Sequence, residues 1–166
     1  MRHAPSFRRP LGLLALLLAL PLLLFGLGTA PAAAANVSNV TFRVPASVQT
    51  NPCFPADVVN LSGTVHVVTA VTGSKNGGFH MVQSLNSRLS GASITTGTNY
   101  TNSETKNDIW RARAPFPVSH TRIHNFVLVS QSSTPNYILH MTLKTTVTAA
   151  GVPVVVVENW HMDCAG

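Results

Sequence analysis

Residues 59–71 read VNLSGTVHVVTAV, and the pattern repeats every second residue. The odd-numbered positions are mostly apolar, whereas the even-numbered positions of the first half are polar. Side chains alternate between the two faces of a β-strand, so this pattern predicts a strand with one buried face. Residues 75–78, KNGG, tolerate positive φ and predict a turn. Residues 79–88 repeat the alternation, which predicts a long hairpin with one apolar side.

The same signals extend over the rest of residues 36–166, where no stretch shows a helical period. Most of residues 137–147 alternate in the same way, residues 149–151 form a turn, and a β-branched run follows toward the C-terminus. Weaker strands are predicted at 40–44, 93–95, 109–114 and 121–131. We therefore expect an all-β antiparallel meander of seven to eight strands. Short turns favour an up-and-down β-barrel over the alternative, a two-sheet β-sandwich.

The N-terminal residues have the three zones of a secretory signal peptide. Arginines open the chain, residues 11–24 are almost all Leu and Ala, and Ala33-Ala34-Ala35 fits a cleavage site. A membrane anchor is the alternative, but the apolar run is short and Pro21 interrupts it. We expect residues 1–35 to be a signal peptide and residues 36–166 a single secreted β domain. The domain would be extracellular or periplasmic, with no integral membrane span after cleavage.

Removing the leader changes the charge of the chain. Residues 36–166 hold eight Lys or Arg and five Asp or Glu, a net charge of +3 rather than the +6 of the whole chain. The basic residues are scattered and form no tract of the kind that nucleic-acid binders use. We expect no nucleic-acid partner and at most a weak attraction to anionic envelope polymers or lipid headgroups. The sequence leaves the oligomeric state open.

The chain contains two cysteines, Cys53 and Cys164. An even number in an exported protein indicates a disulfide, and two cysteines allow one pairing. A metal pair is a poor alternative because the two are far apart in sequence and not in a C-x-x-C motif. The disulfide would connect the start of the domain to its last residues.

Residues 36–166 hold six of the chain's seven histidines, which are many for this length, and they supply most of the candidate site residues. His66, His80 and His140 fall on the polar faces of their strands and are candidate ligand-binding residues. Trp110 is a further candidate, although a core position is the simpler interpretation. His120 and His124 would share a helix face, but four residues of strand span about 13 Å. We therefore expect no metal site and no cofactor.

The sequence gives catalysis little support. It has no G-x-S-x-G elbow, and both cysteines are accounted for by the disulfide. His161 and Asp163 lie two apart on one strand face, so a Ser-His-Asp set stays open as a weak alternative.

Several short motifs resemble a group of small exported bacterial proteins of uncharacterised function. These are Asn51-Pro52-Cys53, the G-T-x-H strand ending at His66, the G-G-x-H hairpin ending at His80, and the C-terminal Cys164. The resemblance supports pairing Cys53 with Cys164 and implies a role for His66 and His80, but no activity. The chain departs from the group at residues 54–57, which weakens any case for a carboxylate site there.

Three functions remain at this point. We expect an exported, non-enzymatic β domain that binds a small apolar ligand inside the barrel or a cell-envelope component on its face. The first alternative is a structural or interaction protein of the envelope with a filled core. The second is a hydrolase or isomerase that uses a histidine and a carboxylate.

Overall fold

The computed structural model describes residues 35–74 and 76–165. Within these ranges the regular structure is entirely β, with no helix. The strands are β1 (Asn36–Thr50), β2 (Val58–Gly73), β3 (Phe79–Ser93), β4 (Asn99–Ala112), β5 (Val118–Ser130), β6 (Tyr137–Val147) and β7 (Pro153–Cys164). The predicted signal peptide, residues 1–35, lies outside the described residues apart from Ala35.

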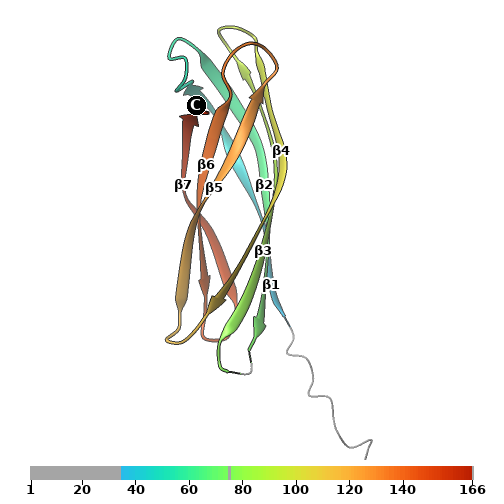
Figure 1. Cartoon of the computed structure of the whole chain (residues 1–166), viewed down its shortest axis with the longest axis vertical. Coiled ribbons are helices and arrows are strands. Elements are labelled where there is room, and N and C mark those ends of the chain that lie inside the picture. Colours follow the sequence, from blue (N-terminus) through green and yellow to red (C-terminus); the bar gives the residue numbers. More distant parts are fainter. Residues whose placement is uncertain (1–34, 75, 166) are drawn as a thin grey trace, which may run out of the picture. The chain divides into compact units, whose positions relative to one another are not determined.

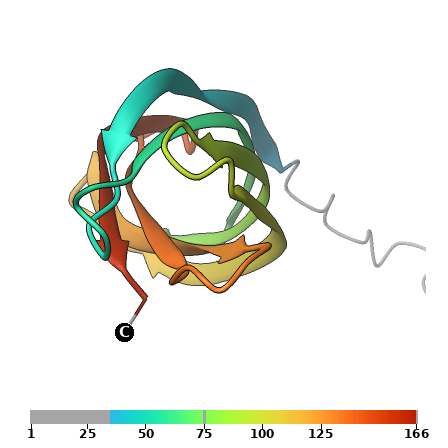
Figure 2. The same cartoon turned by 90° about the horizontal axis from the view of Figure 1, so that it is seen from above.

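The seven strands pair in sequence order, and every pair is antiparallel. The predicted all-β meander is therefore confirmed. The sheet curls into a half-barrel whose strands surround a common interior, as the view along the strands shows (Figures 1 and 2). β1 and β7 lie near each other, although no backbone ladder between them occurs among the described residues.

The half-barrel has two ends, which carry different loops. The disulfide end carries the loops 51–57, 94–98 and 131–136 and the end of β7. The far end carries the loops 74–78, 113–117 and 148–152. Figure 1 shows the C-terminus at the disulfide end, beside the β1–β2 loop.

The alternation that predicted the strands also decides which side chains are buried. On β6 every odd-numbered residue from Tyr137 to Val147 is buried, and the residues between them are half-buried. The main apolar cluster occupies the disulfide end and the middle of the interior, with Tyr100 stacked on Tyr137 at 4.3 Å between ring centroids. A smaller cluster around Val71, Met81 and Val147 lies toward the far end.

A layer of polar side chains separates the two apolar clusters. Gln83 reaches across the interior from β3, and its Nε2 donates to Thr69 Oγ1 at 2.8 Å and to Thr145 Oγ1 at 3.0 Å. Asp108 lies opposite Gln83 on β4, and His120 lies opposite Thr145 on β5. At the level of these residues the interior is polar, and this polar layer extends to the boundary between β4 and β5.

Gly63 allows β2 to bend where it lies between β1 and β3. Its φ of +135° lies in the region that only glycine adopts easily. A Cβ atom at this position would overlap the backbone of β3 at Arg88. The β1–β2 register shifts beside it, between Val44 and Ser47, which is the signature of a β-bulge. The bulge and the glycine together give these long strands the curvature that the half-barrel needs.

The disulfide end is held by a covalent bond and a buried carboxylate. Cys53 and Cys164 form the predicted disulfide. Asp57, the last residue of the β1–β2 loop, is buried and accepts hydrogen bonds from Ser93 Oγ, Asn51 Nδ2 and Tyr137 OH. Burial alone would raise the pKa of Asp57, but these bonds and one from the Val58 backbone outweigh it and lower the pKa below its usual 3.8.

Candidate functional site

The three candidate histidines lie on the outer face of the sheet and in three separate surroundings. His66 is on β2, His80 is on β3 and His140 is on β6. Thr72, the β2 partner of His80, lies about 20 Å along the strand from His66. His140 is in the other half of the sheet, paired with Asn125 of β5 and with His161 of β7. The fold does not bring these three imidazoles into one cluster.

His66 belongs to a polar concavity on the outer face of β1–β4. Its Nε2 lies 2.6 Å from Asn39 Oδ1. The concavity has a volume of about 700 Å³, and hydroxyl, amide and basic side chains form most of its wall, including Thr64, Asn86 and Arg88. Glu104 also contributes to the wall, and its carboxylate is paired with Lys106 at 3.2 Å.

His140 belongs to a hydrogen-bonded row on the outer face of β5–β7. Its Nδ1 lies 2.8 Å from Asn125 Oδ1, and its Nε2 lies 3.1 Å from Asp163 Oδ2. The other oxygen of Asp163 lies 3.0 Å from His161 Nε2. The sequence therefore placed His161 and Asp163 on a common face correctly. Among the described residues no serine hydroxyl bonds to either imidazole, so this row lacks the nucleophile of a Ser-His-Asp set.

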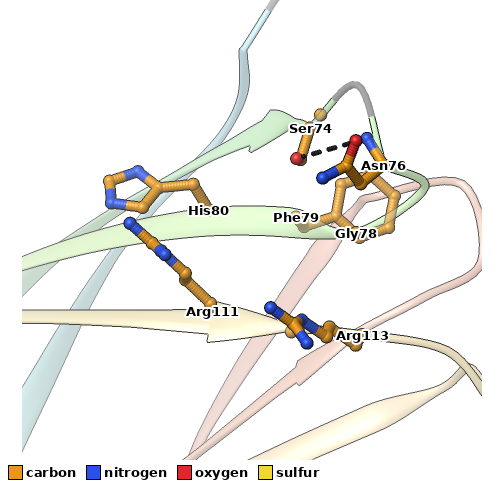
Figure 3. Close-up of a pocket in the computed structure, with 9 residues that line it drawn as sticks. Ser74, Asn76, Gly78, Phe79, His80, Arg111 and Arg113 are labelled. Atoms are coloured by element: carbon orange, nitrogen blue, oxygen red, sulfur yellow. Dashed lines mark hydrogen bonds between the residues drawn. The ribbon is translucent and has the colours of Figure 1, made fainter.

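His80 lines a pocket at the far end, between the β2–β3 turn and the end of β4. The pocket has a volume of about 430 Å³. In Figure 3 the imidazole lies beside the guanidinium of Arg111, its partner on β4, and Arg113 follows on the same wall. Ser74 and Asn76 line the opposite side, where Gly77 with a φ of +74° forms the turn. The pocket walls carry positive charge and hydrogen-bond donors, and no carboxylate.

The whole outer face of β1–β4 also carries positive charge and hydrogen-bond donors. In strands the outward residues alternate with the buried ones, which identifies the outward set. The basic residues and histidines in that set are Arg43, Arg88, Arg111, His66 and His80. The two carboxylates of these strands, Glu104 and Asp108, have the inward parity. No described carboxylate of β1–β4 therefore has the outward parity, and Glu104, the one that reaches the wall of the concavity, is paired with Lys106.

Trp110 has a different setting, at the junction of β4 and β5. It is half-buried, packs against the smaller apolar cluster, and its ring lies 4.7 Å from that of His120. A backbone ladder joins β4 to β5 only at the disulfide end, at Tyr100↔Ser130 and Thr101↔Val129.

Side chains join the two strands beyond that ladder. If the same register continued, Asp108 would face Arg122 and Trp110 would face His120, and these are the pairs in contact. We call this region the β4–β5 seam, and its residues are Lys106, Asp108, Trp110, His120, Arg122 and His124.

The charges in the seam are paired; the Asp108 carboxylate is shielded from solvent, whereas its partner Arg122 is exposed. Arg122 Nη1 donates to Asp108 Oδ1 at 2.7 Å, and His120 Nε2 lies 3.6 Å from Asp108 Oδ2. Asp108 is 6% exposed and His124 is 5% exposed. Burial lowers the pKa of His124 below its usual 6.5; Asp108 opposes the shift, and the positive charges of Arg122 and Lys106 add to it. The His124 imidazole is therefore neutral at neutral pH.

Sequence reasoning singled out Trp110 but did not assemble the seam around it. The sequence signal for the seam is that charged residues of β4 and β5 have the same odd or even numbering as the buried residues of their strands. Asp108 shares the numbering parity of the buried Tyr100, and His124 shares that of the buried Phe126. Charged residues at inward positions of two consecutive strands indicate an interior that is polar at that level.

Comparison with models of known protein families, with curated proteins and with solved structures gave no match. Within residues 35–74 and 76–165, no helix is both long and apolar enough to cross a membrane. The same residues hold no cluster of three or more His, Cys, Asp or Glu side chains arranged to bind a metal ion.

Proposed function

We propose that this protein is an exported, non-enzymatic binding domain whose outer β1–β4 face binds an anionic, hydroxyl-rich polymer of the cell envelope. The observation that carries the proposal is the charge of that face, whose outward side chains include three arginines and two histidines and no described carboxylate. Glu104, which has the inward parity, reaches the wall of the concavity, but its charge is paired with Lys106. Hydroxyl and amide groups fill the space between the cations. Such a surface attracts phosphate or carboxylate groups and hydrogen-bonds to neighbouring hydroxyls.

The pocket of His80 and Arg111 and the concavity of His66 and Arg88 are two hollows of this face. Both are polar, and both could hold a unit of a chain that runs along the strands. The interior, in contrast, is occupied by apolar side chains, which supports a ligand on the outside over an apolar ligand within the barrel. The Cys53–Cys164 disulfide is compatible with an oxidising, exported compartment.

A structural role in the envelope is the second candidate, and the filled interior favours it over a carrier of apolar molecules. The two candidates differ in one measurable property. A binding domain has a saturable affinity that depends on its cationic face, whereas a structural protein has none.

The test measures binding of the purified, disulfide-bonded protein to poly(glycerol phosphate), with neutral dextran as the control polymer. Arg88→Gln and Arg111→Gln should each weaken binding about fivefold, the equivalent of about 1 kcal/mol for one exposed ionic contact. Added salt should weaken binding further, because exposed charges are screened. Lys144→Gln removes an equal charge from the outer face of β6 and serves as the matched control.

Equal affinity for dextran, or an equal effect of Lys144→Gln, would contradict the proposed face. Export is tested separately, by N-terminal sequencing of the protein recovered outside the cells. The sequence should begin within a few residues of Asn36, and an N-terminus at Met1 would refute cleavage.

A further inference from the structure

Four buried polar atoms without a hydrogen-bond partner gather in the β4–β5 seam. They are Asp108 Oδ2, Trp110 Nε1, His120 Nε2 and His124 Nε2. A fifth such atom in the described residues, His140 Nε2, belongs to the outer row and lies 3.1 Å from a carboxylate oxygen. A buried polar atom that lacks a partner costs free energy, so native proteins contain few. Asp108 Oδ2 and His120 Nε2 face each other at 3.6 Å, which is too long for a hydrogen bond. Four such atoms along one boundary indicate a place where another molecule supplies the partners.

The seam is also where the half-barrel can admit a molecule. A surface pocket of about 400 Å³ opens over it, and Asp108 and His124 both contribute to its wall. Because no backbone ladder joins β4 to β5 at this level, their separation breaks side-chain contacts only. Elsewhere in the sheet, consecutive strands are laddered along most of their length.

The charges and donors of the seam define the class of ligand. Asp108 is paired with Arg122, and Lys106 is paired with Glu104, so the site offers no unpaired charge. Asp108 Oδ2 accepts a hydrogen bond and the Trp110 indole donates one, whereas an imidazole Nε2 can do either, according to its tautomer. A hydroxyl group satisfies all of these, because it donates and accepts.

We infer that the β4–β5 seam is a binding site for a small, neutral, polyhydroxylated molecule of monosaccharide size. The Trp110 ring, against which the His120 ring is tilted at 31°, provides an apolar face for the C–H face of a sugar ring. This site is distinct from the outer face of β1–β4, because its side chains have the opposite parity.

The experiment follows the indole N–H resonance of Trp110 by NMR while the disulfide-bonded protein is titrated with glucose or myo-inositol. Saturable shifts are expected for Trp110, and the second tryptophan, Trp160, serves as an internal control. Trp110→Phe keeps an aromatic ring at this position but removes the indole N–H donor. In that variant, and in Asp108→Asn, affinity measured by calorimetry should fall about tenfold. Trp110→Phe is the variant less prone to disturb folding, since the buried ion pair stays intact.

Two comparisons separate this site from the proposed polymer-binding face. Arg88→Gln should leave the sugar affinity unchanged, and Trp110→Phe should leave the polymer affinity unchanged. The inference is overturned if neither neutral probe shifts the Trp110 resonance, or if glucuronate binds as well as glucose. It is also overturned if affinity survives both Trp110→Phe and Asp108→Asn.

Discussion

Replacing Asp57 with Asn removes one negative charge from the disulfide end and changes almost no volume. The Asp57 carboxylate accepts hydrogen bonds from three side chains: Ser93 Oγ on one oxygen, and Asn51 Nδ2 and Tyr137 OH on the other, both at 3.3 Å. An amide has only one accepting end. If its oxygen faces Ser93, its NH₂ group faces that of Asn51, and two donors oppose each other. If its oxygen faces Asn51, its NH₂ group faces Ser93 Oγ, which already accepts from Thr96 N and lies 2.8 Å from Thr96 Oγ1.

At least one hydrogen bond to a charged group is lost in either orientation. Hydrogen bonds to charged groups contribute about 1.5–3 kcal/mol each, and the remaining ones lose their charge assistance. We therefore expect Asp57→Asn to lower the free energy of unfolding by about 3 kcal/mol at neutral pH. Glu158→Gln removes an exposed carboxylate paired with Lys144 at 3.3 Å and should stay within about 0.5 kcal/mol of the wild type.

Urea unfolding at neutral pH and at a series of acidic pH values measures both the size and the origin of this effect. The pKa of Asp57 is lowered in the folded protein, so its contribution is present above the ordinary value of 3.8 and is lost as the pH falls through the folded-state pKa. The difference between wild type and Asp57→Asn should therefore shrink in acid. A difference below about 0.5 kcal/mol at neutral pH, or one that does not change with pH, would refute the reasoning.

Three further outcomes follow from other parts of the fold. Replacing Cys53 and Cys164 by Ser should lower the free energy of unfolding by about 5 kcal/mol, the loop-closure value for a separation of 111 residues; a loss below about 1 kcal/mol in urea unfolding contradicts this. Gly63→Ala should lower the thermal midpoint far more than Gly97→Ala, because a Cβ at Gly63 overlaps the β3 backbone whereas one at Gly97 meets nothing within 4 Å; equal shifts for the two would disprove it. In an NMR titration His124 should have a midpoint below 6.5. With its pKa lowered in the folded protein, His124 binds a proton more readily in the unfolded chain. Its contribution to stability is therefore complete above pH 6.5 and declines as the pH falls below that value. A titration midpoint at or above 6.5 would rule out this contribution.

The strands that could be predicted from sequence are those that alternate between an apolar interior and a polar exterior. The hairpin predicted over residues 59–88 and the strand 137–147 meet that condition, and both are found where the alternation places them, within β2–β3 and β6. The disulfide was predictable as well, because two cysteines allow only one pairing.

β4 was mostly missed, and the reason lies in its position. Only residues 109–114 were predicted as a strand in this region, and 93–95 were expected to be a strand of their own. The structure instead ends β3 at Ser93 and extends β4 over Asn99–Ala112. The inward positions of β4 include Asn102, Glu104 and Asp108, because this strand lines the polar seam, so the apolar half of the alternation is absent.

The candidate site could be predicted only in part, because parity gives the face of a residue and not its neighbours. The even numbers of His66, His80 and His140 indicate the outer face, where all three lie. Their separation depends on the strand register, which short turns and a bulge determine. The seam depends on which neighbouring strands part as the sheet curls, and alternation does not encode that.

The disulfide also makes most of this chain a closed ring. Residues 53–164, which include β2 to β7, form a covalent macrocycle, and β1 lies outside it. A protease that cuts once in any loop between β2 and β7 therefore opens the ring without separating two fragments. A cut between β1 and Cys53 frees β1 covalently, and it then stays attached only by noncovalent contacts, chiefly its backbone ladder with β2 and the packing of Val44 in the core. The molecule consequently has one detachable strand, and after its release the exposed edge of β2 can accept an equivalent strand from a second copy.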